Sequence, residues 1–272
     1  MVSGLTYSQD NSTPLKKSSF ATKSLSVGLG YANVFDTYLS PQEYKGMEIR
    51  VLRESMRMTN WFDGNLSIQN LLQAHFSYTD NYVKNNNSAT GLVNWNYGVH
   101  YQFKINPNFK ILAGALSDLN LGFIYNLRNG NNPASAKFFH NIDASAMAVW
   151  KFSVKQKKMT LRYQLNIPFI GFMFSPHYGQ SYYEIFSLGN KDNVIRFTSF
   201  HNQPSLRQLI SLDVPIKNSL VRFSYLWDAH QSKINQIKTH IYGHSFLIGY
   251  VKNIYRLNNQ EFKNIPDCLK AY

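Results

Sequence analysis

The sequence predicts an all-β protein, a transmembrane antiparallel up-and-down β-barrel, from three observations. First, apolar and polar residues alternate strictly from Val93 to Ile105, and most of the apolar ones are aromatic or β-branched. Because strand side chains point alternately to opposite faces, this segment has one apolar and one polar face. Second, no apolar run approaches the roughly 20 residues that a membrane-spanning helix needs. Third, the mean hydropathy is slightly polar, at −0.32, as expected when only every second residue meets lipid.

Turn signals divide the alternating segments into about 12 strands, an even number with both chain ends on the periplasmic side. Short connections, which we assign to the periplasmic rim, are expected at 62–65, 106–108, 155–158, 189–192 and 215–218. Mostly longer connections, which we assign to the outside, alternate with them near 37–45, 80–90, 128–135, 168–179, 202–205 and 230–239. This alternation of connection lengths is typical of outer-membrane barrels.

The expected strands share the in-out pattern and begin near Ala21, Met47, Asn65, Leu92, Lys110, Phe138, Met159, Gln180, Val194, Leu206, Ser219 and His240. The pattern repeats clearly in 161–167 and in 221–227. In the second strand, apolar residues change parity between Val51 and Met56, which predicts either a β-bulge or a misplaced strand boundary. The segment 180–188 shows the least regular alternation of the set.

The chain is expected to form one domain, a barrel over residues 20–254, with an N-terminal periplasmic arm (1–19) and a C-terminal periplasmic tail (255–272). The arm is polar and has no apolar core of a secretory signal, so we expect that a signal has been removed. The one cysteine, Cys268, allows neither an intrachain disulfide nor a Cys-based metal site.

The net charge of +13 raises the possibility of a nucleic-acid partner, but the lysines gather in the proposed periplasmic turns and the arm, not in one stripe. We therefore expect no nucleic acid. The expected partners are membrane lipids, including lipopolysaccharide, and other outer-membrane or periplasmic proteins.

Charged residues on the polar faces are expected to point into the lumen, where they form a hydrogen-bonded network or line a narrow channel. The network is favoured because buried charges must find partners. A cationic excess in an open pore would instead select anions. The candidate residues are Glu48, Arg50, Lys104, Asp143, Lys151, Arg162, Arg196, Arg207, Asp213, Arg222 and Asp228.

The candidate catalytic residues for a lipid hydrolase are His75 and Ser77, with Asn94 on the next strand as an orienting group. A nucleophile that acts on lipid needs to face the bilayer, with a base in hydrogen-bond reach. Leu72 and Phe76 are expected to face lipid, so His75 and Ser77 face the lumen. We therefore predict no catalytic site. The spacing of His240 and His244 is about 13 Å on a strand, which excludes a shared zinc ion. No cofactor is expected.

The proposed outside loop at 168–179 contains an apolar cluster of Phe169, Ile170, Phe172, Met173 and Phe174. Exposed apolar clusters mark plugs, membrane contacts or partner surfaces, and we favour a plug or a lipid contact. The first outside loop is expected either to pack Tyr38 and Tyr44 over the barrel or to be an ordinary Pro-containing turn.

Two segments, Thr37–Gly46 and Ser175–Phe186, resemble those of an uncharacterised family of outer-membrane β-barrels from Bacteroidota, a domain of unknown function. The resemblance covers nearly the whole chain. It implies a barrel in the bacterial outer membrane, and it transfers no catalytic residue.

These patterns predict a non-catalytic outer-membrane β-barrel that is an accessory or structural subunit of a larger cell-envelope assembly. The alternatives are a narrow anion-preferring channel and an outer-membrane lipid hydrolase that uses His75 and Ser77. A soluble β-sandwich or lipocalin-like binder is a further alternative, but it would have to hide more aromatic surface than one sandwich core offers.

Overall fold

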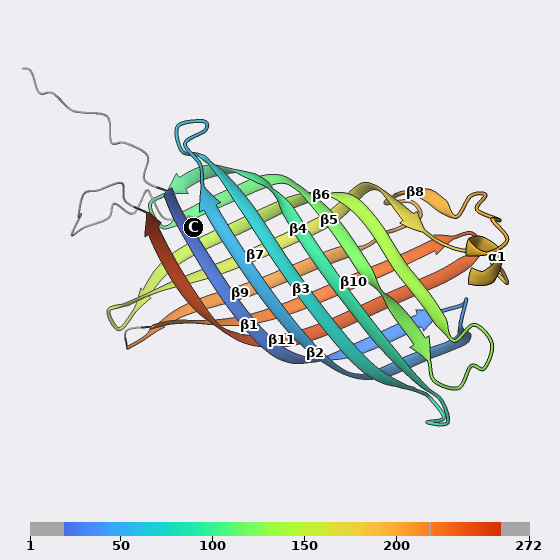
Figure 1. Cartoon of the computed structure of the whole chain (residues 1–272). Coiled ribbons are helices and arrows are strands. Elements are labelled where there is room, and N and C mark those ends of the chain that lie inside the picture. Colours follow the sequence, from blue (N-terminus) through green and yellow to red (C-terminus); the bar gives the residue numbers. More distant parts are fainter. Residues whose placement is uncertain (1–18, 218, 257–272) are drawn as a thin grey trace, which may run out of the picture.

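The computed structural model describes residues 19–217 and 219–256, and these residues form a closed antiparallel β-barrel (Figure 1). Ten strands make the ring, and β8 lies outside it as a short additional strand. The elements are β1 (Ser19–Asp36), β2 (Ser40–Met58), β3 (Leu66–Asn81), β4 (Asn87–Asn106), β5 (Phe109–Asn126), β6 (Ala134–Val154), β7 (Lys157–Phe174), α1 (Tyr182–Phe186), β8 (Ile195–Ser199), β9 (Leu206–Ile216), β10 (Ser219–Ile234) and β11 (Ile237–Arg256).

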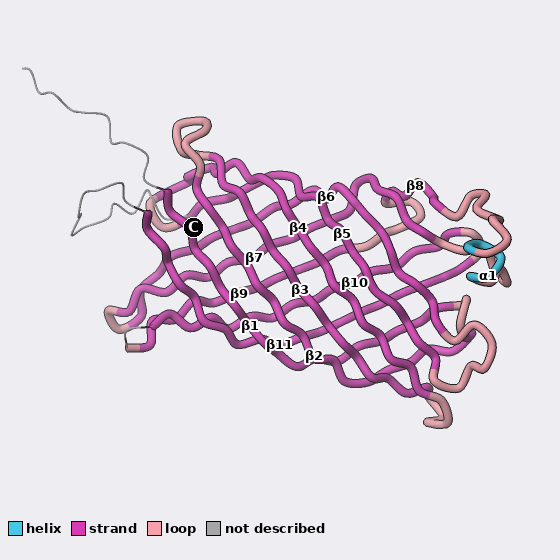
Figure 2. Tube along the Cα trace, in the orientation of Figure 1, coloured by secondary structure: helices cyan, strands magenta, loops and turns pink. Residues whose placement is uncertain are grey.

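The ring closes where the first strand pairs with the last, from Ser19 opposite Arg256 to Asp36 opposite Thr239. Each remaining strand of the ring pairs with the strands that precede and follow it in the chain, except that β7 pairs with β9 to complete the ring. The rim at which β1 begins and β11 ends is called the terminal rim here. The opposite rim carries α1 and is called the helix rim (Figure 2).

The expected strand near 180–188 is wrong, because this segment contains helix α1. Ser181 caps the helix: its side chain accepts a hydrogen bond from the Glu184 N–H, and the Glu184 carboxylate accepts one from the Ser181 N–H. This reciprocal capping box satisfies N–H groups that a short helix otherwise leaves without partners. The turn at 189–192, assigned to the periplasmic rim, therefore lies with α1 at the helix rim.

The expected reversal at 202–205 is also wrong, because β8 and β9 run in the same direction along one edge of β7. Residues 195–199 pair with the last residues of β7, and residues 207–213 pair with 160–166. The barrel therefore has ten crossings instead of about twelve, while the chain still enters and leaves at the same rim.

The expected bulge in the second strand is absent, since β2 pairs with β3 without a register shift. Met56 points into the lumen and is fully buried, so the change of parity reflects apolar residues inside the barrel. The register shift of this hairpin lies instead between Phe35 and Asp36.

The expected loop at 168–179 is mostly strand, because β7 extends to Phe174. Phe169 lies at a register shift opposite Ile142 and Asp143, which leaves this ring 68% exposed on the outer surface. Phe172 is also exposed, whereas Met173 packs on an inner apolar cluster. Other outside connections shorten too, because the strands run past their expected ends.

The outer face of the barrel is apolar, and the lumen holds both polar residues and three apolar clusters. On β4, the outward residues from Val93 to Ile105 are all exposed, while Asn94, Asn96 and His100 are buried. This arrangement confirms the antiparallel barrel class. In the described residues, no helix has the length and apolarity that crossing a membrane requires.

The predicted boundary of the barrel differs from the described strands by one residue at the start and two at the end. Most of the predicted arm (1–19) and tail (255–272) lies outside the described residues.

Replacing Gly114 by alanine is expected to destabilise the barrel by about 1–3 kcal/mol, because an added methyl group would overpack the wall. Its Cβ would lie 1.9 Å from the Val99 carbonyl oxygen, which is backbone and cannot swing away. Denaturant titration in detergent micelles measures the free energy of unfolding. Gly130→Ala is the control, because nothing lies within 4 Å of the added Cβ. Equal stability of the two variants would contradict the packing argument.

Candidate functional site

Charged side chains fill the lumen in two clusters. The first, called the Glu54 cluster, joins strands on opposite walls of the barrel, and its six members are Glu54, Gln69, Arg162, Gln164, Asp213 and Arg222. The second, called the Asp228 cluster, lies nearer the helix rim and consists of Glu48, Arg50, Asp118, Arg207, Asp228 and His230.

Glu54 is the centre of the first cluster. Its two carboxylate oxygens lie 2.7 Å and 2.8 Å from Nη1 and Nη2 of Arg162. Arg222 Nη1 donates to the same carboxylate at 2.7 Å, and Gln69 donates at 2.6 Å. Such bidentate, charge-assisted hydrogen bonds are among the strongest that proteins make. One carboxylate on β2 thus ties together β3, β7 and β10.

Arg222 also binds Asp213 on the neighbouring strand. Its Nε and Nη2 donate to the two carboxylate oxygens at 2.6 Å and 2.8 Å. Arg222 and Asp213 are register partners of β10 and β9, so this pair is a cross-strand pair inside the barrel. The two arginines and two carboxylates of the Glu54 cluster balance in charge.

Asp228 joins two arginines in the second cluster. Arg50 Nη1 lies 3.0 Å from Asp228 Oδ2, and Arg207 Nε lies 3.1 Å from Oδ1. Arg50 Nε donates to Glu48 at 2.9 Å. Arg207 Nη1 donates to Asn94 and to a second asparagine of β4, so its guanidinium is held from both sides of the lumen.

The Asp228 cluster contains two arginines against three carboxylates, so its arginines provide no cationic excess. The buried arginines among the predicted lumen residues, Arg50, Arg162, Arg207 and Arg222, are all ion-paired. A buried charge without a partner costs several kcal/mol, so these groups hold each other in place. Ion pairs between these side chains cross-link the strands inside the lumen, instead of leaving the charges to line a channel.

Three apolar clusters lie among these charges. Near the terminal rim, Met56, Leu112, Met147 and Val149 pack together. The other two clusters consist of Leu52, Leu71, Leu209, Leu226 and Leu247, and of Ala32, Val34, Leu92, Ile124, Phe139 and Ile241. Side chains from opposite walls therefore meet in the lumen.

Eight of the eleven predicted lumen residues are buried inside the barrel. Of these, Asp143 is buried with its Oδ1 atom lacking a hydrogen-bond partner among the described residues. Lys104 and Lys151 lie at the terminal rim in a wide cavity. Arg196 is not in either cluster, because β8 places it on the exposed surface, where it donates to Asn193 at 3.2 Å.

Residues that the sequence prediction missed include Glu54, Asp118 and Gln69. A signal for Glu54 was available, since it shares parity with Glu48 and Arg50 on β2. The change of apolar parity between Val51 and Met56 obscured this signal.

The three catalytic candidates do not form a site. His75 and Ser77 both face the lumen and are buried, and the structure gives no hydrogen bond to His75 Nε2 or Ser77 Oγ among the described residues. Asn94 is the register partner of Gln73 rather than of His75, and it binds Arg207. Among these three residues, no base is therefore placed beside a nucleophile that faces lipid.

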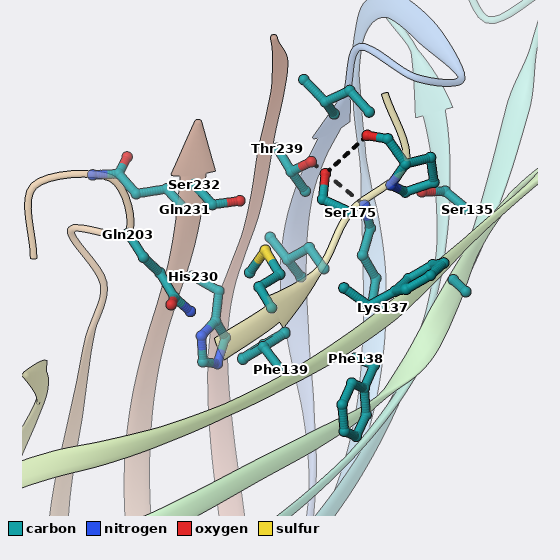
Figure 3. A pocket seen from close by; sticks show the side chains of 16 residues that line it. Ser135, Lys137, Phe138, Phe139, Ser175, Gln203, His230, Gln231, Ser232 and Thr239 are labelled. Carbon is teal, nitrogen blue, oxygen red and sulfur yellow. Dashed lines mark hydrogen bonds between the residues drawn. The ribbon is translucent and has the colours of Figure 1, made fainter. Parts of the chain in front are cut away.

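A small pocket near the helix rim contains buried polar atoms without partners. Figure 3 shows the Gln203 side chain reaching toward His230. Both amide atoms of Gln203 and Nδ1 of His230 lack hydrogen-bond partners in the described part of the chain. The pocket volume is about 30 Å³, which is room for no more than a few water molecules. The pocket is too small for an organic ligand.

A wide cavity, called the terminal vestibule here, opens at the terminal rim with a volume of about 1040 Å³. Lys104, Lys110, Lys151 and Lys158 line it from β4, β5, β6 and β7. Val149 of the apolar cluster near this rim also lines the cavity, so the lysines surround an apolar floor.

At the helix rim, the first turn docks on the α1 segment. The Tyr38 hydroxyl donates to the Gln180 carbonyl at 2.8 Å, and its ring meets Tyr182 edge to face at a centroid distance of 5.8 Å. Burial, followed by the charges of Tyr182, Asp36 and Glu184, raises the pKa of Tyr38 to about 12. The expected packing of Tyr38 over the barrel thus takes the form of a contact with α1.

No group of three or more His, Cys, Asp or Glu side chains in the described ranges is arranged to hold a metal ion. His240 and His244 lie on β11, and each stacks on an aromatic ring, Tyr242 and Trp227 respectively. Cys268 lies outside the described residues.

Glu54→Ala is expected to lower the free energy of unfolding by about 3–5 kcal/mol, because it leaves two buried guanidinium groups without their shared carboxylate. The matched control is Glu43→Ala on the same strand. The Glu43–Lys45 pair is about half exposed, so the control is expected to change stability by about 0–1 kcal/mol. Denaturant titration in one detergent compares the two, and similar losses would show that the Glu54 cluster contributes no special stability.

The hydroxyl of Tyr38 is expected to ionise near pH 12. Because the folded-state pKa lies above the ordinary value of 10.0, the contribution to stability is fully present below pH 10.0 and is lost as the pH rises toward 12. Phenolate absorbance of the wild type minus that of Tyr38→Phe gives this titration. A midpoint near 10 would mean that the contact with the α1 segment does not shield Tyr38.

The barrel resembles solved outer-membrane structures at low sequence identity. The transport unit of the autotransporter AIDA-I from Escherichia coli is 8% identical, with 93% of each chain covered and a TM-score of 0.49. The outer membrane protease OmpT from Escherichia coli is 8% identical over 87% of this chain and 97% of that chain, with a TM-score of 0.43. The COG4313 outer membrane channel from Pseudomonas putida F1 is 8% identical over 86% and 95%, with a TM-score of 0.34.

These likenesses concern the barrel architecture, and no residue role is transferred from them. No curated protein matches the chain. A family model covers residues 3–261, nearly the whole chain, which confirms the expected membership of an uncharacterised family. The chain belongs to the family described as "Protein of unknown function (DUF3316)".

Proposed function

We propose that this protein is a closed, non-conducting and non-catalytic barrel of the bacterial outer membrane that is an accessory or structural subunit of a larger cell-envelope assembly. The observation that carries this proposal is the filled lumen. Two ion-paired clusters and three apolar clusters occupy it between the rims. A subunit of this kind contributes its surfaces and rims to the assembly, while its interior provides stability.

The apolar outer face supports the location in a membrane. On β4, the outward residues Val93, Trp95, Tyr97, Val99, Tyr101, Phe103 and Ile105 are 38–60% exposed. The distance from Val93 to Ile105 is about 40 Å along a strand, or about 30 Å across a bilayer at a tilt of about 40°. This height is sufficient for the apolar band of an outer-membrane barrel, which is about 25 Å tall.

Connection lengths support an orientation with the terminal rim in the periplasm. Three of the four connections at the terminal rim, 107–108, 155–156 and 217–218, consist of two residues. The long segment 175–194 with α1 lies at the helix rim. Outer-membrane barrels place short turns in the periplasm and longer loops outside. In this orientation the helix rim faces the leaflet that carries lipopolysaccharide. A Bacteroidota origin, which the family resemblance implies, is part of the proposal.

The two alternative functions find less support in the geometry. An anion channel needs arginines that face open water, whereas Arg162, Arg207 and Arg222 are paired with carboxylates. A lipid hydrolase needs its nucleophile on the bilayer side, whereas Ser77 is buried in the lumen.

The wild-type barrel is expected to give no conductance steps in a planar lipid bilayer, because paired side chains block the lumen. A double variant, Arg207→Ala and Asp228→Ala, removes a cross-strand pair whose members also bind Asn94 and Arg50 on other strands, and it is expected to conduct. Heat-modifiable migration in gels verifies that both proteins are folded. Conductance of the wild type would contradict the closed barrel.

The accessory role has its own experiment, which is purification from native membranes in a mild detergent followed by subunit identification. A partner protein in a fixed ratio is the expected result. A barrel that always purifies alone would contradict the accessory role and leave only the structural one.

A further inference from the structure

The outer face of the terminal rim carries four cations on three neighbouring strands, β11, β1 and β2 (Figure 1). They are called the seam cations here, because they lie where the first and last strands pair, and they are Lys23, Arg53, Arg57 and Lys252. Each is exposed and shares the parity of outward apolar residues on its own strand, such as Leu25 on β1. Their side chains therefore lie on the outer side of the wall and not in the lumen.

Lys23 is the centre of the seam cations. Lys252 is its direct register partner on β11, and the Cβ atoms of such partners are about 5 Å apart. On β2 the register partner of Lys23 is Ser55, so Arg53 and Arg57 each lie two residues from the direct position, on opposite sides of it. Diagonal neighbours of this kind are about 7–8 Å apart. Because lysine and arginine side chains are long and flexible, their charged groups can reach one anionic head group beside Lys23.

No carboxylate neutralises the seam cations within the described part of the chain. None of the four side chains has an ion-pair or hydrogen-bond partner there. Glu54 is adjacent in sequence, but it points into the lumen and binds arginines of other strands. Like charges directly opposite each other destabilise a sheet, as at Lys23 and Lys252. An anion that binds beside them removes this repulsion.

Apolar side chains border the seam cations. On β3, Ile68 and Leu72 are the register partners of the two arginines. On β1, the next outward residue after Lys23 is Leu25, which is 55% exposed. The charges therefore lie at the edge of the apolar outer face, the level at which the head groups of a bilayer meet its hydrocarbon core.

The rest of the terminal rim has no such cluster on the outer face of its described strands. There β4 presents Tyr101 and Phe103, and β6 presents Trp150 and Val154, all of them exposed. One further outward cation in these strands at this rim is Lys157, the first residue of β7. Positive charge is thus concentrated in one sector of the wall, on both sides of the junction that closes the barrel.

A phospholipid with a net negative head group matches both features of this sector. Its phosphate accepts hydrogen bonds from guanidinium and ammonium groups, and arginine binds phosphate with two parallel hydrogen bonds. Its acyl chains lie against the apolar outer face that begins at Leu25 and Leu72. A zwitterionic head group fits less well, because its own ammonium group would lie beside four cations.

We propose that the seam cations form a binding site for one anionic phospholipid of the periplasmic leaflet. The inference rests on the proposed function, since it takes the terminal rim to lie in the periplasm. The bound lipid covers the junction of β1 and β11 from the outside and neutralises the repulsion across it. A free phosphate ion has no acyl chains to place on the apolar surface, so it binds less tightly.

Native mass spectrometry of the full-length protein in a neutral detergent tests the proposal. Phosphatidylglycerol is added in increasing amounts, and the fraction of protein that carries one lipid is measured. We expect one molecule to bind more tightly than those that follow. Phosphatidylcholine with the same acyl chains measures non-specific adsorption and is expected to show no such tight first molecule.

The double variant Lys23→Gln and Arg53→Gln is expected to weaken binding of the first phosphatidylglycerol about tenfold or more, because two of the four charges are lost. Lys252→Gln alone is expected to weaken it less, and it provides a second reading if the double variant fails to fold.

The matched control is the double variant Lys155→Gln and Lys157→Gln, which removes an equal charge from the β6–β7 hairpin at the same rim. It is expected to bind phosphatidylglycerol as the wild type does. Soluble glycerol 3-phosphate represents the head group alone and is expected not to displace the lipid at equal concentration.

Three outcomes of the binding experiment would overturn the proposal. The first is that the folded wild type binds phosphatidylglycerol no more tightly than phosphatidylcholine. The second is that the Lys23 and Arg53 double variant binds as tightly as the matched control. The third is displacement of the lipid by glycerol 3-phosphate, which indicates a free phosphate ligand.

The orientation of the rim is measured separately. Asn108→Cys, in the exposed turn 107–108, is combined with Cys268→Ser and treated with a maleimide on a large polyethylene glycol. We expect labelling only after the outer membrane is permeabilised. Labelling on intact cells would refute the periplasmic orientation and direct the seam cations to the phosphates of lipopolysaccharide. Lipid binding does not depend on conductance, so a closed barrel without a tight lipid refutes only this site, and a conducting barrel with one refutes only the closed lumen.

Discussion

The structure depends on the closure of one hydrogen-bonded ring. Pairing of β1 with β11 gives the first and last strands a partner on each side, so no exposed strand edge remains along their shared length. In a bilayer, an unpaired backbone group costs several kcal/mol, so closure is required. Closure also fixes the register, and the register decides which face each side chain occupies.

Because the register fixes which side chains enter the lumen, these side chains must pack and pair with one another. Glu54 satisfies two arginines, and Asp228 satisfies two more, so each carboxylate joins walls that are far apart along the sheet. Removing either partner alone leaves a charge in a place that water reaches poorly. The leucine and methionine clusters between these groups pack in the space that polar side chains leave.

The strand pattern in the sequence identified the fold class because the lipid-facing surface obeys a simple rule. Every second residue from Val93 to Ile105 is apolar, and the structure exposes all of them. The strand count was less accessible. The segment 180–188 contains Ser181 and Glu184 at the spacing of a capping box, which was the available sign of a helix. The two-strand error arose because 180–188 contains α1, and because β8 and β9 run in the same direction beside β7 instead of reversing.

The candidate site was only partly predictable for a related reason. Parity selects residues that point inward, and it identified Arg50, Arg162, Arg207 and Arg222. Parity does not reveal which charges meet, since that depends on the barrel circumference and the strand tilt. It also gave no warning that apolar residues such as Met56 enter the lumen. That four lysines line one cavity follows from the register of four strands, which the sequence alone does not provide.

The separation of interacting residues along the chain has a consequence for folding. Glu54 binds partners that lie 108 and 168 residues later in the chain, and Arg50 binds one that lies 178 residues later. Strand β1 has its second neighbouring strand only when β11 pairs with it. Contacts of such long range are slow to form, because the chain must lose much of its conformational entropy before they become favourable. The early strands therefore hold Glu54 and Arg50 without their distant partners until the last strands arrive. Completion of the wall and neutralisation of its interior then occur together, as one cooperative late event.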